Sequence, residues 1–358
     1  MLLTSCKNGD VEFDNYDYQT VSFAYQRYVR TLQMGDDVYP TDDDNQHKFY
    51  IKATLGGDRN LADEHKIQIT VDNSLCDGLT FADNGGQPVL PMPTEYYTLG
   101  SNVITIPAGQ VSGGVEVKLT DAFFADPKAL DVTYVIPIRM VNAGNDSILS
   151  GTAKSTVANP KLQNASDWDV APKNYALCAV KYKNKYDGSW ISYGTDCIGI
   201  DGVETTTKRE QEYLEKNDIR YISSLGLNSS LYALTGTAKI TSADGTETTA
   251  ALTANMILNV DDSGNVTITS DNKTGIAVPG SVSGGTYSYT ATGTGTWKYQ
   301  GAKKAWGDKD RDMMTLDYTV TFKYTDNGVE HVMTYKCQDN LVFRSHENTL
   351  QTFDVNYN

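Results

Sequence analysis

The chain has 358 residues, a formal net charge of −15 at pH 7 and a sequence pI near 4.6. This length predicts two domains, each large enough to bury its own core, and the abundance of Gly and Tyr, together with Thr, Asn and Asp, favours short strands joined by tight turns. The acidic balance argues against nucleic-acid or anionic-lipid ligands, and no run of about 18 apolar residues is present to span a bilayer.

The N-terminus carries a candidate lipidation motif. Leu3-Thr4-Ser5-Cys6 has the pattern of a bacterial lipobox, a Leu and two small residues before the Cys that is lipidated, so it predicts lipid attachment at Cys6. The apolar stretch before Cys6 is too short for a complete signal peptide, and we expect the native leader to be longer. Residues 7–20 are polar and acidic and are expected to form a tether. The alternative is a chance cysteine in a cytosolic protein.

The first half of the chain alternates between polar and apolar residues. About seven short strands separated by turn signals are typical of an immunoglobulin-like β-sandwich, which we predict over residues 21–158. A short insertion with one helical turn is expected at 121–130, and the polar, Pro-containing segment 159–164 is predicted to be the interdomain linker. The strands are expected near residues 19–28, 49–55, 67–71, 103–106, 115–119, 132–141 and 151–157.

Residues 165–358 also alternate, and they predict eight or more antiparallel strands. This pattern favours a lipocalin-like antiparallel β-barrel or a second β-sandwich. Asp261–Asn265 and Asp326-Asn327-Gly328 are strong hairpin turns, whereas 205–216 fits a helix, an edge strand or a loop. The clearest strands are expected near residues 232–241, 254–260, 266–268, 287–291, 316–324 and 329–337, with a final strand within 341–353.

The four remaining cysteines are Cys76, Cys178, Cys197 and Cys337. None forms a CxxC pair, and the chain is too long for a disulfide scaffold. A hairpin turn at Asp187-Gly188 would place Cys178 opposite Cys197, within disulfide range. Two buried free thiols are the alternative that we favour.

A search for catalytic chemistry finds little. The four histidines lack zinc-ligand spacing, and neither a GxSxG elbow nor a P-loop occurs. Asp308, Asp310 and Asp312 alternate like the start of a calcium loop, but Met313 and Thr319 stand where the motif needs Gly and Glu. We therefore predict a protein that is not an enzyme and needs no metal or cofactor. The alternative is a glycosidase-type pair of carboxylates, for which the chain has enough acidic residues.

Aromatic residues offer a better indication of function. Sugar rings present apolar C–H faces that stack on Trp and Tyr, and Trp297, Tyr299 and Trp306 lie together among Lys, Asp and Gly. These three, with Trp190 after the Asp187-Gly188 turn, are the candidate glycan-stacking residues. Filling the core is the alternative for each, and it is favoured for Trp190.

Three segments, together with the lipobox and the acidic tether, carry a resemblance to a known family. These segments are 168–175 (WDVAPKNY), 180–188 (VKYKNKYDG) and 305–312 (AWGDKDRD). The chain resembles Bacteroidetes surface lipoproteins encoded in polysaccharide-utilisation loci, whose N-terminal domain of unknown function also precedes some endo-glycosidases. The resemblance implies display on the outer membrane, a glycan ligand and an outer-membrane glycan transporter complex as a partner. It supplies no catalytic residues.

Three functional hypotheses follow from these features. The first is a lipid-anchored, cell-surface glycan-binding protein that assists the capture of polysaccharide or glycoprotein glycans. The second is a structural or adhesive surface protein, such as a fimbrial-type subunit or a scaffold. The third is a divergent glycoside hydrolase.

Overall fold

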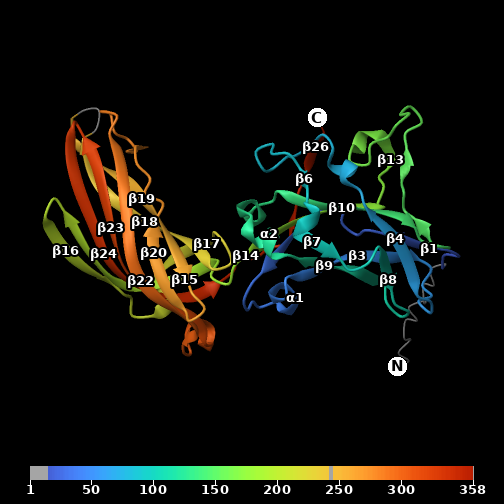
Figure 1. Ribbon diagram of the computed structural model, residues 1–358, viewed down its shortest axis with the longest axis horizontal. Coiled ribbons are helices and arrows are strands. Elements are labelled where there is room, and N and C mark those ends of the chain that lie inside the picture. Colours follow the sequence, from blue (N-terminus) through green and yellow to red (C-terminus); the bar gives the residue numbers. More distant parts are fainter. Residues whose placement is uncertain (1–14, 242–244, 358) are drawn as a thin grey trace, which may run out of the picture. The chain divides into compact units, whose positions relative to one another are not determined.

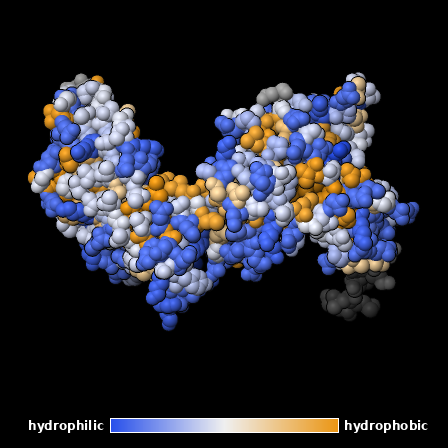
Figure 2. All heavy atoms as spheres, viewed as in Figure 1, coloured by the Kyte–Doolittle hydropathy of each residue, from blue (hydrophilic) through white to orange (hydrophobic). Residues whose placement is uncertain are grey.

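The computed structural model describes residues 15–241 and 245–357, apart from the side chain of Trp306. The chain folds into two compact units: Met1–Thr31, Gln46–Lys181 and Leu350–Asn358 form the first, and Leu32–Asn45 and Tyr182–Thr349 form the second. Both are built almost entirely of strands (Figure 1), so the predicted all-β class is confirmed. Figure 2 shows hydrophilic residues spread over the visible face, interspersed with residues of intermediate hydropathy and patches of hydrophobic ones.

The first unit is organised around a twelve-stranded sheet. Its main path runs β11-β1-β3-β9-β8-β4-β10-β14-β2-β25, with β6 and β7 joined to β10 and β9. Apolar side chains that alternate along β3 and β4 form its core, as expected for strands with one buried face. The strands are β1 (Gln19–Ser22), β2 (Arg27–Gln33), β3 (Lys48–Gly57), β4 (His65–Val71), β6 (Leu90–Pro91), β7 (Tyr97–Leu99), β8 (Val103–Ile106), β9 (Ser112–Leu119), β10 (Tyr134–Asn142), β11 (Ser147–Ile148), β14 (Tyr175–Lys183) and β25 (Gln351–Thr352).

Short elements complete the first unit. The strand pairs are β12 (Thr152–Ala153) with β13 (Trp168–Val170), and β5 (Leu79–Phe81) with β26 (Val355–Tyr357). The predicted helical insertion is confirmed as α2 (Asp121–Ala125) followed by the 3-10 helix η3 (Pro127–Leu130). The other helices in the described residues are α1 (Asp42–Asn45), η1 (Asn73–Cys76), η2 (Thr94–Tyr96), η4 (Ala165–Asp167), η5 (Leu214–Lys216) and η6 (Trp306–Asp308). In the described part of the chain, no helix has the length and apolar character needed to cross a membrane.

The second unit is a nearly closed ring of antiparallel strands. Neighbours follow the order β15-β17-β18-β19-β20-β22-β23-β24, and β24 pairs back to β15; β16 and β21 pair with β15 and β22. The strands are β15 (Gly188–Ile200), β16 (Val203–Arg209), β17 (Asp218–Ser224), β18 (Ser229–Thr241), β19 (Glu247–Val260), β20 (Asn265–Ser270), β21 (Ile276–Ala277), β22 (Thr286–Ala302), β23 (Arg311–Asp326) and β24 (Val329–Ser345). This architecture confirms the predicted antiparallel fold, and the ambiguous segment at 205–216 contributes an exposed strand, β16.

The ring is open on one side, and side chains cover the open edge. Strand β17 reaches β18 only at Ile222–Ser224, and no pairing joins β16 to the rest of β18 among the described residues. The free backbone of β18 bonds instead to side chains of β23 and β24. Tyr335 Oη accepts from Thr237 N at 3.2 Å, Tyr324 Oη donates to Lys239 O at 3.3 Å, and Asp326 accepts from the Thr241 amide at 2.9 Å.

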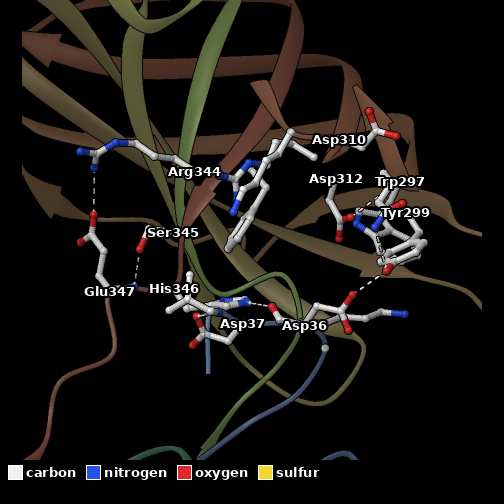
Figure 3. A pocket seen from close by; sticks show the side chains of 17 residues that line it. Asp36, Asp37, Trp297, Tyr299, Asp310, Asp312, Arg344, Ser345, His346 and Glu347 are labelled. Atoms are coloured by element: carbon white, nitrogen blue, oxygen red, sulfur yellow. Dashed lines mark hydrogen bonds and ion pairs between the residues drawn. The ribbon is translucent and has the colours of Figure 1, made fainter. Parts of the chain in front are cut away.

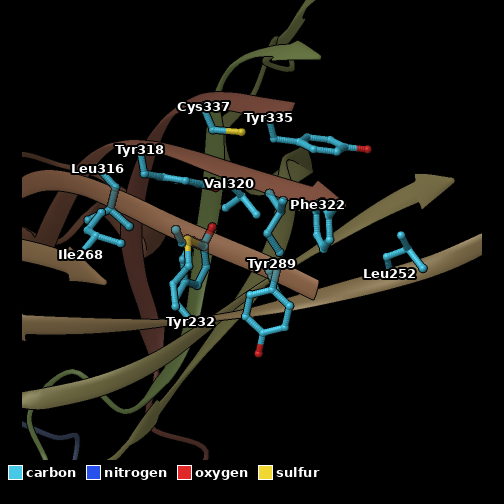
Figure 4. Packing of buried hydrophobic residues seen from close by; sticks show 14 of the residues in the cluster. Tyr232, Leu252, Ile268, Tyr289, Leu316, Tyr318, Val320, Phe322, Tyr335 and Cys337 are labelled. Carbon is cyan, nitrogen blue, oxygen red and sulfur yellow. The ribbon is translucent and has the colours of Figure 1, made fainter. Parts of the chain in front are cut away.

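Inward-facing residues fill the ring. Along β18, β19 and β23 every second residue is buried, which gives a packed core of aromatic and aliphatic side chains. Figure 4 shows Tyr232, Tyr318 and Phe322 pointing into this core. Because side chains occupy the interior, we expect a ligand to bind at the ends of the strands.

The division of the chain differs from the predicted one. The predicted linker 159–164 lies inside the first unit, because β14 pairs with β10 and extends the first sheet. Residues 350–358 also belong to the first unit, where β25 pairs with β2, and residues 32–45 belong to the second. The domain ranges 21–158 and 165–358 were therefore wrong, because contacts between distant segments override the local change in composition at residue 160.

The predicted hairpin between Cys178 and Cys197 is also wrong. Cys178 lies on β14 opposite Ile136 of β10, Cys197 lies on β15, and both are free thiols. Burial raises the pKa of Cys178 to about 12, which keeps this thiol protonated and unreactive. Gly188 does not serve as a hairpin-turn residue. A Cβ there would lie 2.3 Å from Ser345 O, so glycine permits β24 to approach closely.

Candidate ligand-binding site

A cleft of about 630 Å³ lies at the end of the ring where β22 and β24 finish and β23 begins. All of its lining residues belong to the second unit, although they come from five separate parts of the chain (Figure 3). The lining residues are 35–38, Lys185, Trp297, Tyr299, Gln300, 309–312 and 343–347.

Trp297 forms one wall of the cleft and is partly buried against the core. Its backbone amide donates to Gly264 O at 2.7 Å, and Tyr186 packs edge-on against its ring with centroids 5.4 Å apart. The Lys185 ammonium lies 4.2 Å from the centre of the indole ring, within cation–π range. This lysine covers one indole face, so Trp297 presents only part of its surface to a ligand.

Tyr299 is the more accessible aromatic residue, with 52% of its surface exposed. Its hydroxyl donates to Asp36 Oδ2 at 2.5 Å and accepts from Gln300 Nε2 at 3.0 Å, two contacts that hold the ring in place. The hydrogen bond to Asp36 raises the pKa of Tyr299, so the phenol stays protonated. A register shift in β22 between Lys298 and Ala302 carries Tyr299 out of the regular strand and into the cleft.

Carboxylates supply hydrogen-bond acceptors around these two rings. Asp312 accepts from the Gln300 amide at 2.8 Å; burial raises the pKa of Asp312 despite that bond, and the charge of Asp36 raises it further. Asp310 pairs with Lys303 at 2.8 Å, which lowers the pKa of Asp310. The cleft thus combines aromatic surface with acceptors suited to hydroxyl groups.

His346 holds in place the loop that carries Asp36. The imidazole is 3% exposed, with Nδ1 2.5 Å from Asp187 O and Nε2 3.0 Å from Asp36 O. The histidine joins the end of β24 to two loops and thereby positions the acidic side of the cleft.

The structure brings two of the four predicted stacking residues together. Trp297 and Tyr299 both line the cleft, whereas the Trp306 side chain and the predicted lipid site Cys6 lie outside the described residues. Trp190 requires a correction. It is 0% exposed, donates its indole N–H to Tyr186 O at 3.0 Å and packs against Phe343, so it belongs to the core and is inaccessible to a ligand.

The sequence did not indicate Asp36 or His346 as residues of the site. They lie 263 and 47 residues from Tyr299 and belong to no recognisable motif. Their role depends on the segment 32–45 belonging to the second unit. Among the residues that the structure describes, no group of three or more His, Cys, Asp or Glu side chains is placed to hold a metal ion.

Comparison with known proteins identifies two family models and a similar solved structure. Residues 185–347 match a domain of unknown function, DUF5627, and residues 14–147 match a model described only as a "-like, N-terminal domain". A Bacteroides ovatus structural-genomics protein of unknown function is 34% identical, with a TM-score of 0.79 over 96% of this chain and 100% of that one. No curated protein matches the sequence.

Two further solved structures are much less similar. A multidomain protein including DUF1735 from Bacteroides ovatus is 13% identical, with a TM-score of 0.43 over 90% of this chain and 94% of that one. An auxiliary nutrient binding protein from Bacteroides thetaiotaomicron is 12% identical, with a TM-score of 0.37 over 88% and 91%.

Proposed function

We propose that this chain, which belongs to the family of the Bacteroides ovatus protein of unknown function with which it shares 34% identity, is a non-catalytic glycan-binding protein of the cell surface. The observation that carries the proposal is the cleft in which exposed Tyr299 and partly buried Trp297 stand beside Asp36 and Asp312. Binding is reversible: a sugar ring stacks on Tyr299, and its hydroxyls donate to the carboxylates. Display of many copies on one membrane supplies avidity.

The arrangement of the aromatic residues favours Tyr299 over Trp297 as the stacking surface. Lys185 covers one face of Trp297, whereas Tyr299 is more than half exposed and is held by two hydrogen bonds. A ring that is already fixed loses little conformational entropy when a ligand stacks on it. Replacing Tyr299 is therefore expected to reduce ligand binding with little effect on folding.

The test is a screen of the soluble, non-lipidated chain on a glycan array and by affinity gel electrophoresis, followed by titration of the best glycan. Losing an aromatic stacking partner costs about 1–3 kcal/mol, by analogy with base stacking on aromatic side chains. Tyr299→Ala is thus expected to weaken binding about tenfold or more. Tyr299→Phe keeps the ring and loses the Asp36 contact, so it is expected to retain most of the affinity.

Tyr221→Ala is the matched control, because Tyr221 is 60% exposed on β17 of the same unit and does not line the cleft. It is expected to bind like the wild type. Failure of the wild-type chain to bind any glycan on the array would argue against the proposed function. Equal binding by the Tyr299→Ala variant and the wild type would place the site elsewhere.

We also propose that Cys6 is lipidated and anchors the protein to the outer membrane beside a glycan transporter complex. The support is the Leu3-Thr4-Ser5-Cys6 motif and the acidic segment that follows it. Metabolic labelling with a palmitate analogue in a Bacteroides host, with the native leader in place, is expected to mark the wild type and not Cys6→Ser. Labelling of both chains to the same extent would exclude Cys6 as the attachment site.

A further inference from the structure

Strand β16 forms an exposed edge of the second unit. Among the described residues it pairs only with β15, and Figure 1 shows it at the margin of that unit. Residues 203–208 are all exposed, and half of them are threonines. An edge strand presents a row of backbone N–H and C=O groups to any strand that can lie beside it. This edge can therefore pair with a further strand.

The turn that leads into β16 determines which of its backbone groups face the free edge. Asp201 and Gly202 connect Ile200 to Val203, and their φ angles of 47° and 89° are both positive, as in a type I′ hairpin turn. Across such a turn the carbonyl of the first flanking residue accepts from the amide of the last. The Val203 amide therefore points to β15.

Three residues of β16 direct their backbone groups to the free edge. In an antiparallel pair, residues that bond to the neighbouring strand alternate with residues whose N–H and C=O groups point away from it. Counting from Val203, the residues that point away from β15 are Glu204, Thr206 and Lys208. In the part of the chain that the structure describes, no backbone contact outside the strand pairs involves these groups. The free edge thus offers a donor and an acceptor from each of the three residues.

The same three residues make the edge complementary to itself. When two copies of β16 lie antiparallel with Thr206 opposite Thr206, Glu204 of each copy lies opposite Lys208 of the other. This register pairs every outward backbone group and sets opposite charges beside one another at both ends. Any other antiparallel register pairs fewer of these groups, and none of them sets Glu204 opposite Lys208.

We propose that β16 pairs with β16 of a second copy of this chain, in the register that sets Glu204 opposite Lys208. The charges decide the partner, because an edge that carries only lysine repels a copy of itself, which is a common protection against aggregation. Strand β16 carries both signs at positions symmetric about Thr206, so a second copy supplies the matching charges. Each β16 has one free edge among the described residues, so the assembly closes at two copies.

The two charged side chains have partners within their own copy. Lys336 donates to Glu204 at 2.6 Å, and Lys208 lies 2.5 Å from Glu210. The bond from Lys336 lowers the pKa of Glu204, so this carboxylate is ionised at neutral pH. Both ion pairs are exposed, and exposed pairs contribute little to stability, so a second copy can share these charges.

The test is sedimentation velocity of the full soluble, non-lipidated chain at low ionic strength over a range of concentrations. The wild type is expected to dimerise with a dissociation constant of about 10–100 µM, because two polar strands bury little apolar surface and such interfaces are weak. Glu204→Lys and Lys208→Glu each place like charges opposite one another at both ends of the register. Each variant alone is expected to self-associate about tenfold or more weakly than the wild type.

Mixing the two variants tests the register itself. In the mixed pair one strand carries two bases and the other two acids, so both ends again join opposite charges. The mixture is therefore expected to form a heterodimer that is about tenfold or more tighter than the homodimer of either variant. Lys323→Glu makes the same change of charge on the exposed face of β23 and is expected to dimerise like the wild type.

Hydrogen exchange in the wild type gives a readout that needs no variant. The amides of Glu204, Thr206 and Lys208 are expected to become protected as the protein concentration rises. A chain that stays monomeric up to about 1 mM overturns the proposal and leaves the edge to a strand of another protein. A dimer that persists unchanged in both single variants, or a mixture that forms no heterodimer, overturns it as well.

Discussion

Replacing Asp339 by alanine is expected to lower the free energy of unfolding of the second unit by about 3–5 kcal/mol, the usual cost of removing one partner from a buried ion pair. Asp339 is 2% exposed at the centre of a polar network inside the ring. Its Oδ2 accepts from the Tyr232 hydroxyl at 2.7 Å and the Tyr318 hydroxyl at 2.8 Å, and its Oδ1 pairs with the Arg209 guanidinium. Alanine leaves all three donors without this acceptor.

The same network holds β16 against the ring. Arg209 is the last residue of β16, and it also pairs with Asp196 of β15 at 2.6 Å. Burial, reinforced by the charge of Asp339, raises the pKa of Tyr232 well above its ordinary value, so this donor stays protonated at every pH of interest. In the variant, Arg209 keeps its ion pair with Asp196. The expected loss of stability is therefore the loss given above for one missing partner of a buried ion pair.

Urea unfolding followed by tryptophan fluorescence measures the change, because three of the four tryptophans belong to the second unit. Asp317→Ala is the control: Asp317 lies on the neighbouring strand β23, is exposed and accepts a hydrogen bond from Gln338. It is expected to change stability by less than about 0.5 kcal/mol. A loss below about 1 kcal/mol for Asp339→Ala would mean that the network contributes no more than an ordinary neutral hydrogen bond.

Asn184→Asp is expected to destabilise the second unit by about 3 kcal/mol at pH 7, because it turns a buried donor into an acceptor. Asn184 is 0% exposed, and its Nδ2 donates to Gly226 O, Ser229 O and Ser230 Oγ at 2.8–2.9 Å. A carboxylate oxygen in the same place faces two carbonyl oxygens that it repels. The change alters one atom and leaves the size of the side chain unchanged.

This substitution leaves the contact that shapes the first cleft in place. Asn184 Oδ1 accepts from the Tyr186 amide at 3.0 Å and so shapes the turn that places Lys185 over Trp297. Aspartate keeps this acceptor, so the folded variant is expected to bind glycan like the wild type in the same affinity gel. Asn259→Asp on the exposed face of β19 is the control and is expected to change neither property. If both variants unfold at the same urea concentration, the buried amide does not stabilise the turn.

The strands and turns that the sequence predicted correctly are those that depend on residues close together in the chain. Alternation of apolar residues identified β18, β19, β23 and β24, because residues two apart in a strand face the same side. The Asp326-Asn327-Gly328 turn was recognised because both of its central residues adopt positive φ, 48° for Asn327 and 78° for Gly328, which suits Asn and Gly. Trp297 and Tyr299 were found together because they are close in sequence.

The partners of these elements were decided by the tertiary structure. Strand β14 pairs with β10 and leaves β15 to pair with β24 and β17, so the hairpin expected between β14 and β15 does not form. Trp190 and Tyr299 are both aromatic residues in polar surroundings, yet one is fully buried and the other 52% exposed. Asp36 reaches Tyr299 because distant segments fold into one unit. Pairing and burial depend on contacts between distant residues, and alternation along a strand carries no information about which strand lies beside it.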